Sequence, residues 1–137
     1  MAKKPESFDK LIDSLEERVK ELNCLYEIEE ILNRSGNSVE EALTQIVRKI
    51  PNGFQYTDIC SSKIVYRNEE YFSDDFKDSL WSLSADISIQ RRVVGWITVY
   101  YFEEKPELEV GPFFSEEKRL LNTIAERIGH YIMYQKL

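Results

Sequence analysis

The sequence is poor in the residues that build cross-linked or metal-bound proteins. Its 137 residues include two cysteines, one histidine, five glycines and four prolines. Two cysteines, Cys24 and Cys60, are too few for the disulfide framework of a small extracellular domain, which favours a reducing compartment. The single histidine, His130, excludes most histidine-rich metal sites. We therefore expect neither a metal nor a cofactor.

Long apolar runs are also missing. No stretch approaches the roughly 18 consecutive apolar residues of a membrane span, and residues 1–10 lack the apolar core of a signal peptide. We expect a cytoplasmic protein without membrane insertion. The formal net charge of −7 argues against nucleic acid or an anionic membrane as the main partner. The length predicts one structural domain that is large enough to bury a core.

Residues 6–34 contain neither proline nor glycine and predict one long helix. Its apolar residues alternate at spacings of four and three, the heptad pattern of a helix that pairs with another helix. This seam consists of Phe8, Ile12, Leu15, Val19, Leu22 and Tyr26. After Leu22 the apolar face broadens, as in a helix that docks on a globular body. We interpret residues 1–34 as a dimerisation helix whose end docks on its own domain; the alternative is a helix packed wholly within one monomer.

Residues 35–137 predict a compact domain with mixed secondary structure. Ser38 and Glu41 fit a capping box at the start of a second helix. Strand-forming residues follow, in predicted strands over residues 55–66, 70–72, 81–89 and 93–103. Ser115 is expected to cap the last helix, and we assign Ile128 and Tyr131 of that helix to the dimer interface. The predicted fold is α+β, an antiparallel sheet of four to five strands with helices on one face.

Residues 81–89 alternate between apolar and polar side chains, the pattern of a half-buried antiparallel strand. A three-residue loop over 90–92 would pair Ile89 with Val93, Ile87 with Gly95 and Ala85 with Ile97. The opposite sheet face then carries small polar and aromatic groups that suit a small ligand or a partner surface. The candidate ligand-binding residues are Ser84, Asp86, Trp96, Thr98 and Tyr100. The alternative is that this face is solvated, or covered by the apolar residues of the loop 103–114.

Patterns of catalytic chemistry are absent from the sequence. It contains no glycine-rich phosphate loop, nucleophile elbow or His-Glu-x-x-His motif. Asp86 is the one carboxylate predicted to have the buried setting that raises a pKa, and its neighbours on that face are serines. We interpret His130 as a helix-surface residue and Cys60 as a core residue. We interpret Cys24 as a packing residue where the dimerisation helix meets the body of the domain. We therefore predict no catalytic residues and no enzyme activity.

Three segments resemble those of a GAF domain, a sensory module that precedes histidine kinases and other signalling outputs. They are the helix 21–28, the glycine-marked strand 93–99 and the closing helix 115–125, and the resemblance spans nearly the whole chain. It implies a compact sensory fold over 35–137. The signature of cyclic-nucleotide-binding members and a bilin-attachment cysteine are absent, and residues 73–80 are too few to roof a ligand pocket. The resemblance therefore implies neither of those ligands.

We thus expect a non-enzymatic sensory or signal-relay domain that forms a homodimer through its terminal helices. A small molecule or a partner protein on the sheet is the candidate ligand, and a signalling output domain or protein is the candidate partner. The second hypothesis is a purely structural dimerisation or adaptor protein without a ligand. A third is a small enzyme that holds Asp86 or His130 in a deep pocket. The heptad pattern leaves open whether the paired helices run parallel or antiparallel.

Overall fold

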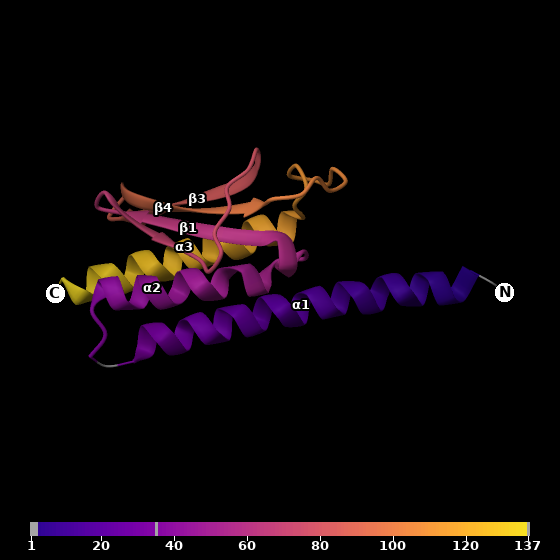
Figure 1. The fold of residues 1–137 in the computed structure, drawn as a ribbon. Helices are drawn as coiled ribbons and strands as arrows, with labels where there is room; N and C mark the ends of the chain where they lie inside the picture. The colour runs from indigo at the N-terminus through magenta and orange to yellow at the C-terminus, as the bar shows by residue number, and fades with distance from the viewer. Residues whose placement is uncertain (1–2, 35, 137) are drawn as a thin grey trace.

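The computed structural model describes residues 3–34 and 36–136 and has three layers (Figure 1). The first layer is a four-stranded antiparallel sheet. Helices α2 (Val39–Lys49) and α3 (Ser115–Gln135) pack against one face of this sheet. The long helix α1 (Lys3–Asn33) packs on those two helices, on the side away from the sheet. This arrangement confirms the predicted α+β fold with helices on one face of an antiparallel sheet.

The sheet has the strand order β2-β1-β4-β3. The strands are β1 (Cys60–Tyr66), β2 (Glu69–Phe72), β3 (Trp81–Ile89) and β4 (Arg92–Tyr101). The prediction that a strand begins at residue 55 was wrong, because two 3₁₀ helices, η1 (Ile50–Gly53) and η2 (Thr57–Ile59), come first. Pro51, the second residue of η1, has a φ angle already set for a helical turn. Phe54 then enters the core completely, so burial overrides local strand propensity.

The predicted register of the β3–β4 hairpin is confirmed as far as Ile87, which pairs with Gly95, as Ala85 pairs with Ile97. Beside the turn the prediction was wrong, because Ile89 pairs with Arg92 and not with Val93. The loop is shorter than predicted, however: Gln90 and Arg91 alone form it, with φ angles of 50° and 68°. Left-handed backbone at both central residues is the geometry of a type I′ turn, whose twist matches that of the flanking strands. The chain accommodates the shorter loop through a bulge after Ile87.

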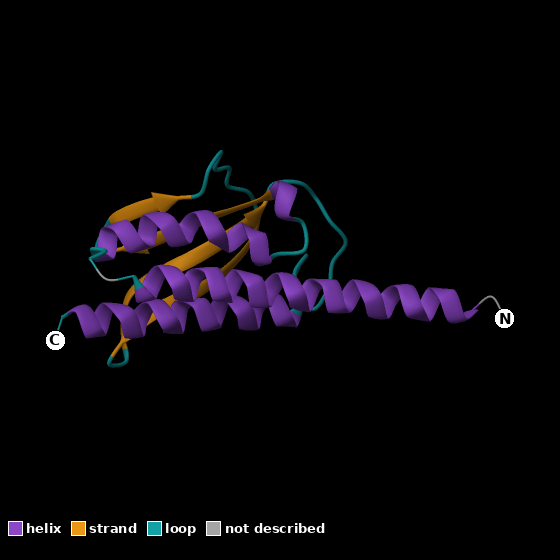
Figure 2. Cartoon of the chain, turned by 90° about the horizontal axis from the view of Figure 1, so that it is seen from below, coloured by secondary structure: helices purple, strands orange, loops and turns teal. Residues whose placement is uncertain are grey.

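Helix α1 has two halves with different surroundings. The side chains of residues 8–16 are exposed, and this part projects beyond the body of the protein (Figure 2). The second half docks on η1, α2 and α3 through Cys24, Ile28 and Ile31, each at most 2% exposed. The end of the helix thus docks on its own body. The alternative of a helix packed wholly within the monomer does not describe the projecting half.

The starts of α2 and α3 are stabilised differently. Ser38 caps α2 as predicted: its Oγ accepts a hydrogen bond from the backbone N–H of Glu41 at 3.1 Å, and the Glu41 carboxylate accepts one from the backbone N–H of Ser38 at 3.0 Å. The prediction that Ser115 caps α3 was wrong, because Phe114 occupies the N-cap position. Phenylalanine has no side-chain acceptor, so the backbone N–H of Glu117 donates to the Phe114 carbonyl, at 3.0 Å. The Glu117 carboxylate in turn accepts from the backbone N–H of Phe114 at 2.8 Å.

Helix α3 also lies along the free edge of β3. The Lys118 ammonium group donates to the backbone carbonyl of Ser84 at 2.7 Å. Further along, the buried Gly129 lets the helix approach the backbone carbonyl of Ser88 closely. A Cβ atom built on Gly129 would lie 2.6 Å from that oxygen. The missing side chain at Gly129 is therefore a packing requirement.

We predict that Gly129→Ala destabilises the protein, although alanine is favoured over glycine in helices by about 1 kcal/mol. The added methyl group must displace the β3 edge or α3, which costs about 1–3 kcal/mol. Urea unfolding followed by circular dichroism measures the change. His130→Ala, at the exposed neighbouring position, is the matched control and should change stability by less than about 0.5 kcal/mol. Equal or greater stability of the alanine variant at 129 would contradict the close approach.

Candidate functional site

The six seam residues predicted for α1 form one exposed apolar surface, which we call the α1 stripe. Their exposed fractions run from 46% at Ile12 to 65% at Leu22 and Tyr26, and the neighbouring Leu11 is 56% exposed. From Phe8 to Tyr26 the stripe is about 27 Å long at the helical rise of 1.5 Å per residue. A contiguous exposed apolar surface of this kind is a candidate interaction site.

The stripe continues from the projecting half of α1 onto the docked half. Leu22 and Tyr26 point to solvent, although Cys24 between them is buried against the body. The docked side and the stripe are therefore opposite sides of one helix. Within the described residues, the contacts of α1 with the body leave the stripe free.

Ile128 and Tyr131, which we had assigned to the same interface, lie elsewhere. Both belong to the chain's own core, with exposed fractions of 0% and 8%. The Tyr131 hydroxyl donates to the backbone carbonyl of Asn37 at 3.3 Å. The apolar side of α3 is occupied by the sheet and by α1, so these two residues do not extend the stripe.

The five candidate ligand-binding residues share the sheet face that is turned away from the helices. Ser84 pairs with Thr98 across the strands, and Asp86 pairs with Trp96. The hydroxyl oxygens of Ser84 and Thr98 lie 2.9 Å apart and hydrogen-bond to each other. Trp96 is 43% exposed, so an aromatic surface remains accessible beside this satisfied polar pair.

The cover on this face comes from a different segment than the loop 103–114. Phe76, between β2 and β3, packs edge-on against Phe72 and Tyr100, with ring centroids 4.8 Å and 5.6 Å away. Phe113 of the loop 103–114 instead stacks on Tyr101 in the core, at a centroid distance of 4.5 Å. The loop therefore closes one end of the core, and Phe76 covers only part of the open face.

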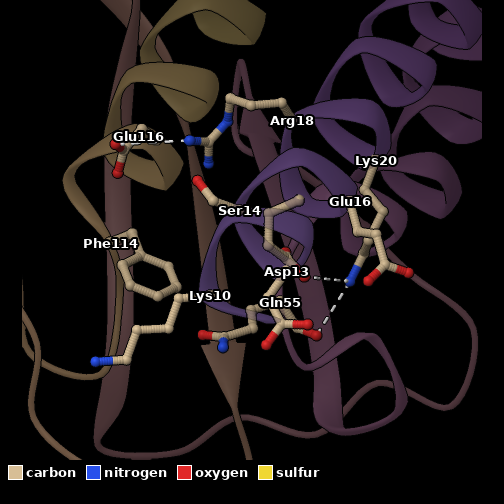
Figure 3. A pocket seen from close by; sticks show the side chains of 10 residues that line it. Lys10, Asp13, Ser14, Glu16, Arg18, Lys20, Gln55, Phe114 and Glu116 are labelled. Carbon is tan, nitrogen blue, oxygen red and sulfur yellow. Dashed lines mark hydrogen bonds and ion pairs between the residues drawn. The ribbon is translucent and has the colours of Figure 1, made fainter. Parts of the chain in front are cut away.

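A groove of about 610 Å³ lies where the projecting half of α1 leaves the body. Figure 3 shows that its walls come from α1 and from the start of α3. Arg18 crosses it, 2.7 Å from the Glu21 carboxylate and 3.6 Å from that of Glu116. Lys20 donates to the backbone carbonyl of Gln55 at 3.1 Å. Charged contacts thus link the stripe-bearing helix to the start of α3.

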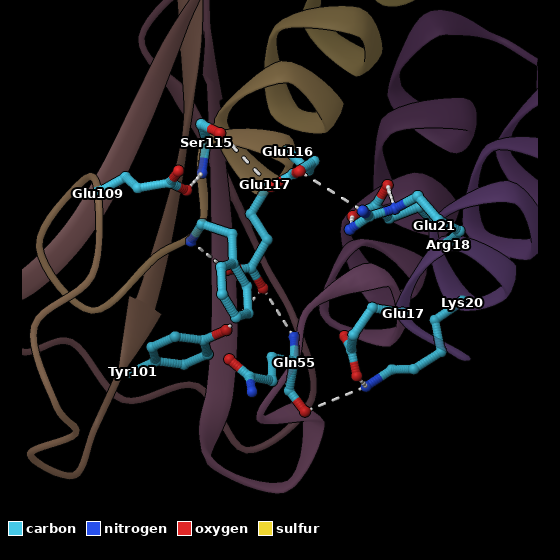
Figure 4. A network of polar contacts seen from close by, with 11 residues as sticks. Glu17, Arg18, Lys20, Glu21, Gln55, Tyr101, Glu109, Ser115, Glu116 and Glu117 are labelled. Carbon is cyan, nitrogen blue, oxygen red and sulfur yellow. Dashed lines mark hydrogen bonds and ion pairs between the residues drawn. The ribbon is translucent and has the colours of Figure 1, made fainter. Parts of the chain in front are cut away.

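Behind this groove lies a buried carboxylate that the sequence analysis did not single out. Glu117 is 1% exposed. It accepts hydrogen bonds from the backbone N–H of Gln55 at 2.7 Å, from that of Phe114 and from the Tyr101 hydroxyl at 3.0 Å (Figure 4). It thereby joins α3 to β4 and to the segment after η1. Asp86, the carboxylate we had singled out, is exposed.

Burial shifts the pKa values of the titratable groups in the core, including Glu117. It raises the pKa of Glu117 above its ordinary value, against the opposing effect of its three hydrogen-bond donors. Burial also raises the pKa of the Cys24 thiol to about 12 and raises that of Cys60. Both thiols therefore stay protonated at neutral pH and lack thiolate reactivity. In residues 3–34 and 36–136, no group of three or more His, Cys, Asp or Glu side chains is placed to hold a metal ion.

We predict that Glu117→Gln lowers the free energy of unfolding by about 1–3 kcal/mol, because the amide NH2 group that replaces one carboxyl oxygen is a donor and cannot accept from the backbone N–H groups of Gln55 or Phe114. The wild-type advantage should also depend on pH. A raised pKa means that the folded state binds the proton more tightly than the unfolded chain does. The contribution of Glu117 is therefore fully present below its unfolded pKa and is lost as the pH rises through the folded pKa.

Urea titrations of both proteins at several pH values from about 4 to 8 measure this difference. The exposed Glu126→Gln on the same helix is the control and should follow the wild-type profile. A wild-type advantage that grows with pH would contradict the assignment.

No protein-family model matches the chain, and no curated protein sequence matches it. Among the described residues, no helix is both long and apolar enough to cross a membrane.

Proposed function

We propose that the chain is a non-enzymatic, GAF-like sensory or signal-relay domain that works as a homodimer held by the α1 stripe. The observation that supports this proposal is the stripe itself, which is exposed along both the projecting and the docked half of α1. Burial of these side chains against a second copy would be strongly favourable, at about 25 cal/mol per Å² of apolar surface removed from water. The heptad spacing suits a partner helix of the same kind.

The contacts around α1 support a relay role. The same helix that carries the stripe is linked to α3 by Arg18 and Glu116, and to the segment after η1 by Lys20. The N-terminal end of α1 and the C-terminal end of α3 lie at opposite ends of the body (Figure 1). A change in how two α1 helices pair would therefore reach α3 through direct contacts and be passed to an output domain or protein at the far end. A ligand shifts such an equilibrium only by binding one arrangement more tightly.

The open sheet face is the candidate sensing surface. Trp96 and Tyr100 offer aromatic area beside Asp86 and the Ser84–Thr98 pair, which suits a small molecule with a flat apolar part. The face belongs to β3 and β4, and the Tyr101 hydroxyl of β4 contacts Glu117. Binding on the sheet is thus connected, through Tyr101, to Glu117 at the start of α3.

The second candidate function is a structural dimerisation or adaptor protein without a ligand. Two contacts on the open face favour it: the Ser84 and Thr98 hydroxyls hydrogen-bond to each other, and Phe76 already packs on Tyr100. In this case the α1 stripe would still form the dimer, and the open face would have no ligand.

We predict that the double variant Leu15→Asp, Leu22→Asp converts a dimer into a folded monomer. Placing carboxylates in an apolar seam costs about 3 kcal/mol or more, which weakens the dimer by about 100-fold or more. Sedimentation equilibrium measures the association, and circular dichroism checks the fold. The control is Ser14→Asp, which adds a charge beside the stripe at another exposed position. An unchanged mass for the double variant would contradict the proposal.

Native mass spectrometry of the wild-type protein distinguishes the two candidate functions. A sensor should show the mass of two chains plus an adduct that is lost on denaturation. Trp96→Ala should then remove the adduct and leave the dimer intact, because Trp96 lies on the sheet face and away from the stripe. A dimer without an adduct favours the adaptor function, and a monomer contradicts both.

A further inference from the structure

The identities of the residues within the α1 stripe carry information about the direction of the partner helix. In the heptad defined by the spacing of the stripe, Ile12 and Val19 take the a positions, and Leu15 and Leu22 take the d positions. Among parallel coiled coils, side chains branched at Cβ in a combined with leucine in d favour two strands over three or four. The exposed part of the seam thus has the side-chain pattern of a parallel pair.

The charges that flank the stripe disfavour the opposite direction. Glu16 takes an e position and Arg18 a g position of the same heptad. In an antiparallel pair, e residues face e residues and g residues face g residues. An antiparallel pair centred on the stripe would therefore place Glu16 against Glu16 of the second copy, and these like charges are destabilising. Arg18 is paired with Glu21 and Glu116 of its own chain and therefore does not decide the direction.

A parallel pair avoids the contact between the two Glu16 side chains. There, each g residue faces the e residue of the partner's next heptad. Leu11 then lies beside the aliphatic stem of the second copy's Glu16, and Arg18 lies beside its Asn23. Leu11 is 56% exposed in the single chain, so this arrangement also removes an apolar side chain from water that the six-residue stripe does not include.

We propose that two copies of this chain pair their α1 helices in parallel and in register, with Ile12, Leu15, Val19 and Leu22 each opposite the same residue of the second copy. This inference rests on the proposed homodimer and adds its geometry. Helices α1 and α3 run in the same direction within one chain (Figure 1). A parallel dimer therefore places both bodies side by side and the C-terminal ends of both α3 helices at the same end of the assembly.

Disulfide trapping tests the direction. Leu15→Cys and Val19→Cys are prepared separately, mixed under reducing conditions so that subunits exchange, and then oxidised. A parallel pair puts each new cysteine opposite its own copy. It leaves residues 15 and 19 about 6 Å apart along the axis in addition to the separation between the helices, which is too far for a disulfide. An antiparallel pair centred on the stripe puts Leu15 opposite Val19. The two variant chains differ in mass by one CH₂ group, so intact mass spectrometry resolves the three linked products.

We expect covalent homodimers of each variant and at least tenfold less of the mixed product. Predominance of the mixed product would overturn the parallel arrangement and leave the homodimer in place. Absence of any linked product overturns it as well; light scattering then shows whether the protein is a monomer, in which case the proposed function fails too.

Ser14→Cys, nearly isosteric and pointing away from the seam, is the control for random collision. If it links as readily as Leu15→Cys, the parallel assignment fails. The native Cys24 and Cys60 are buried, and the wild-type protein gives the background.

Discussion

The burial of one side of α1 is the interaction on which the rest of the arrangement depends. Cys24, Ile28 and Ile31 fit against η1, α2 and α3, and this contact fixes the rotation of the helix about its own axis. A continuous helix carries that rotation along its whole length, because each residue turns by a constant angle. The side chains of the projecting half, which are exposed, are therefore held in a defined direction.

A polar corner complements this apolar contact. Glu117 is surrounded by donors from three separate segments, and Arg18 and Lys20 bring α1 to the same place. Hydrogen bonds to a buried carboxylate are strong and directional, because little water competes for them. The apolar contact sets how α1 is rotated, and the polar corner sets where α3 begins relative to the sheet. The two contacts together make the body a firm base for the projecting helix.

Local pattern was sufficient to predict much of this structure. The alternation of residues 81–89 gave the register with β4, the Ser38–Glu41 pair gave the start of α2, and the heptad spacing gave the stripe. The features that escaped prediction depend on contacts between distant segments. Phe54 is drawn into the core and replaces the start of a strand by 3₁₀ turns. Glu117 looks like ordinary first-turn charge until Tyr101 and Gln55 fold against it.

The edges of the sheet decide which kinds of assembly this protein can form. The outer strand β2 is only four residues long and carries the exposed Glu69 and Glu70, while the longer β3 is flanked by α3 through Lys118 and Gly129. Neither edge offers a long, uncharged row of backbone groups to a strand from another molecule. Growth by strand addition, which has no natural end, is thereby discouraged. The proposed association through one helix of each copy would use up the apolar surface that drives it, so that assembly would stop at a finite size.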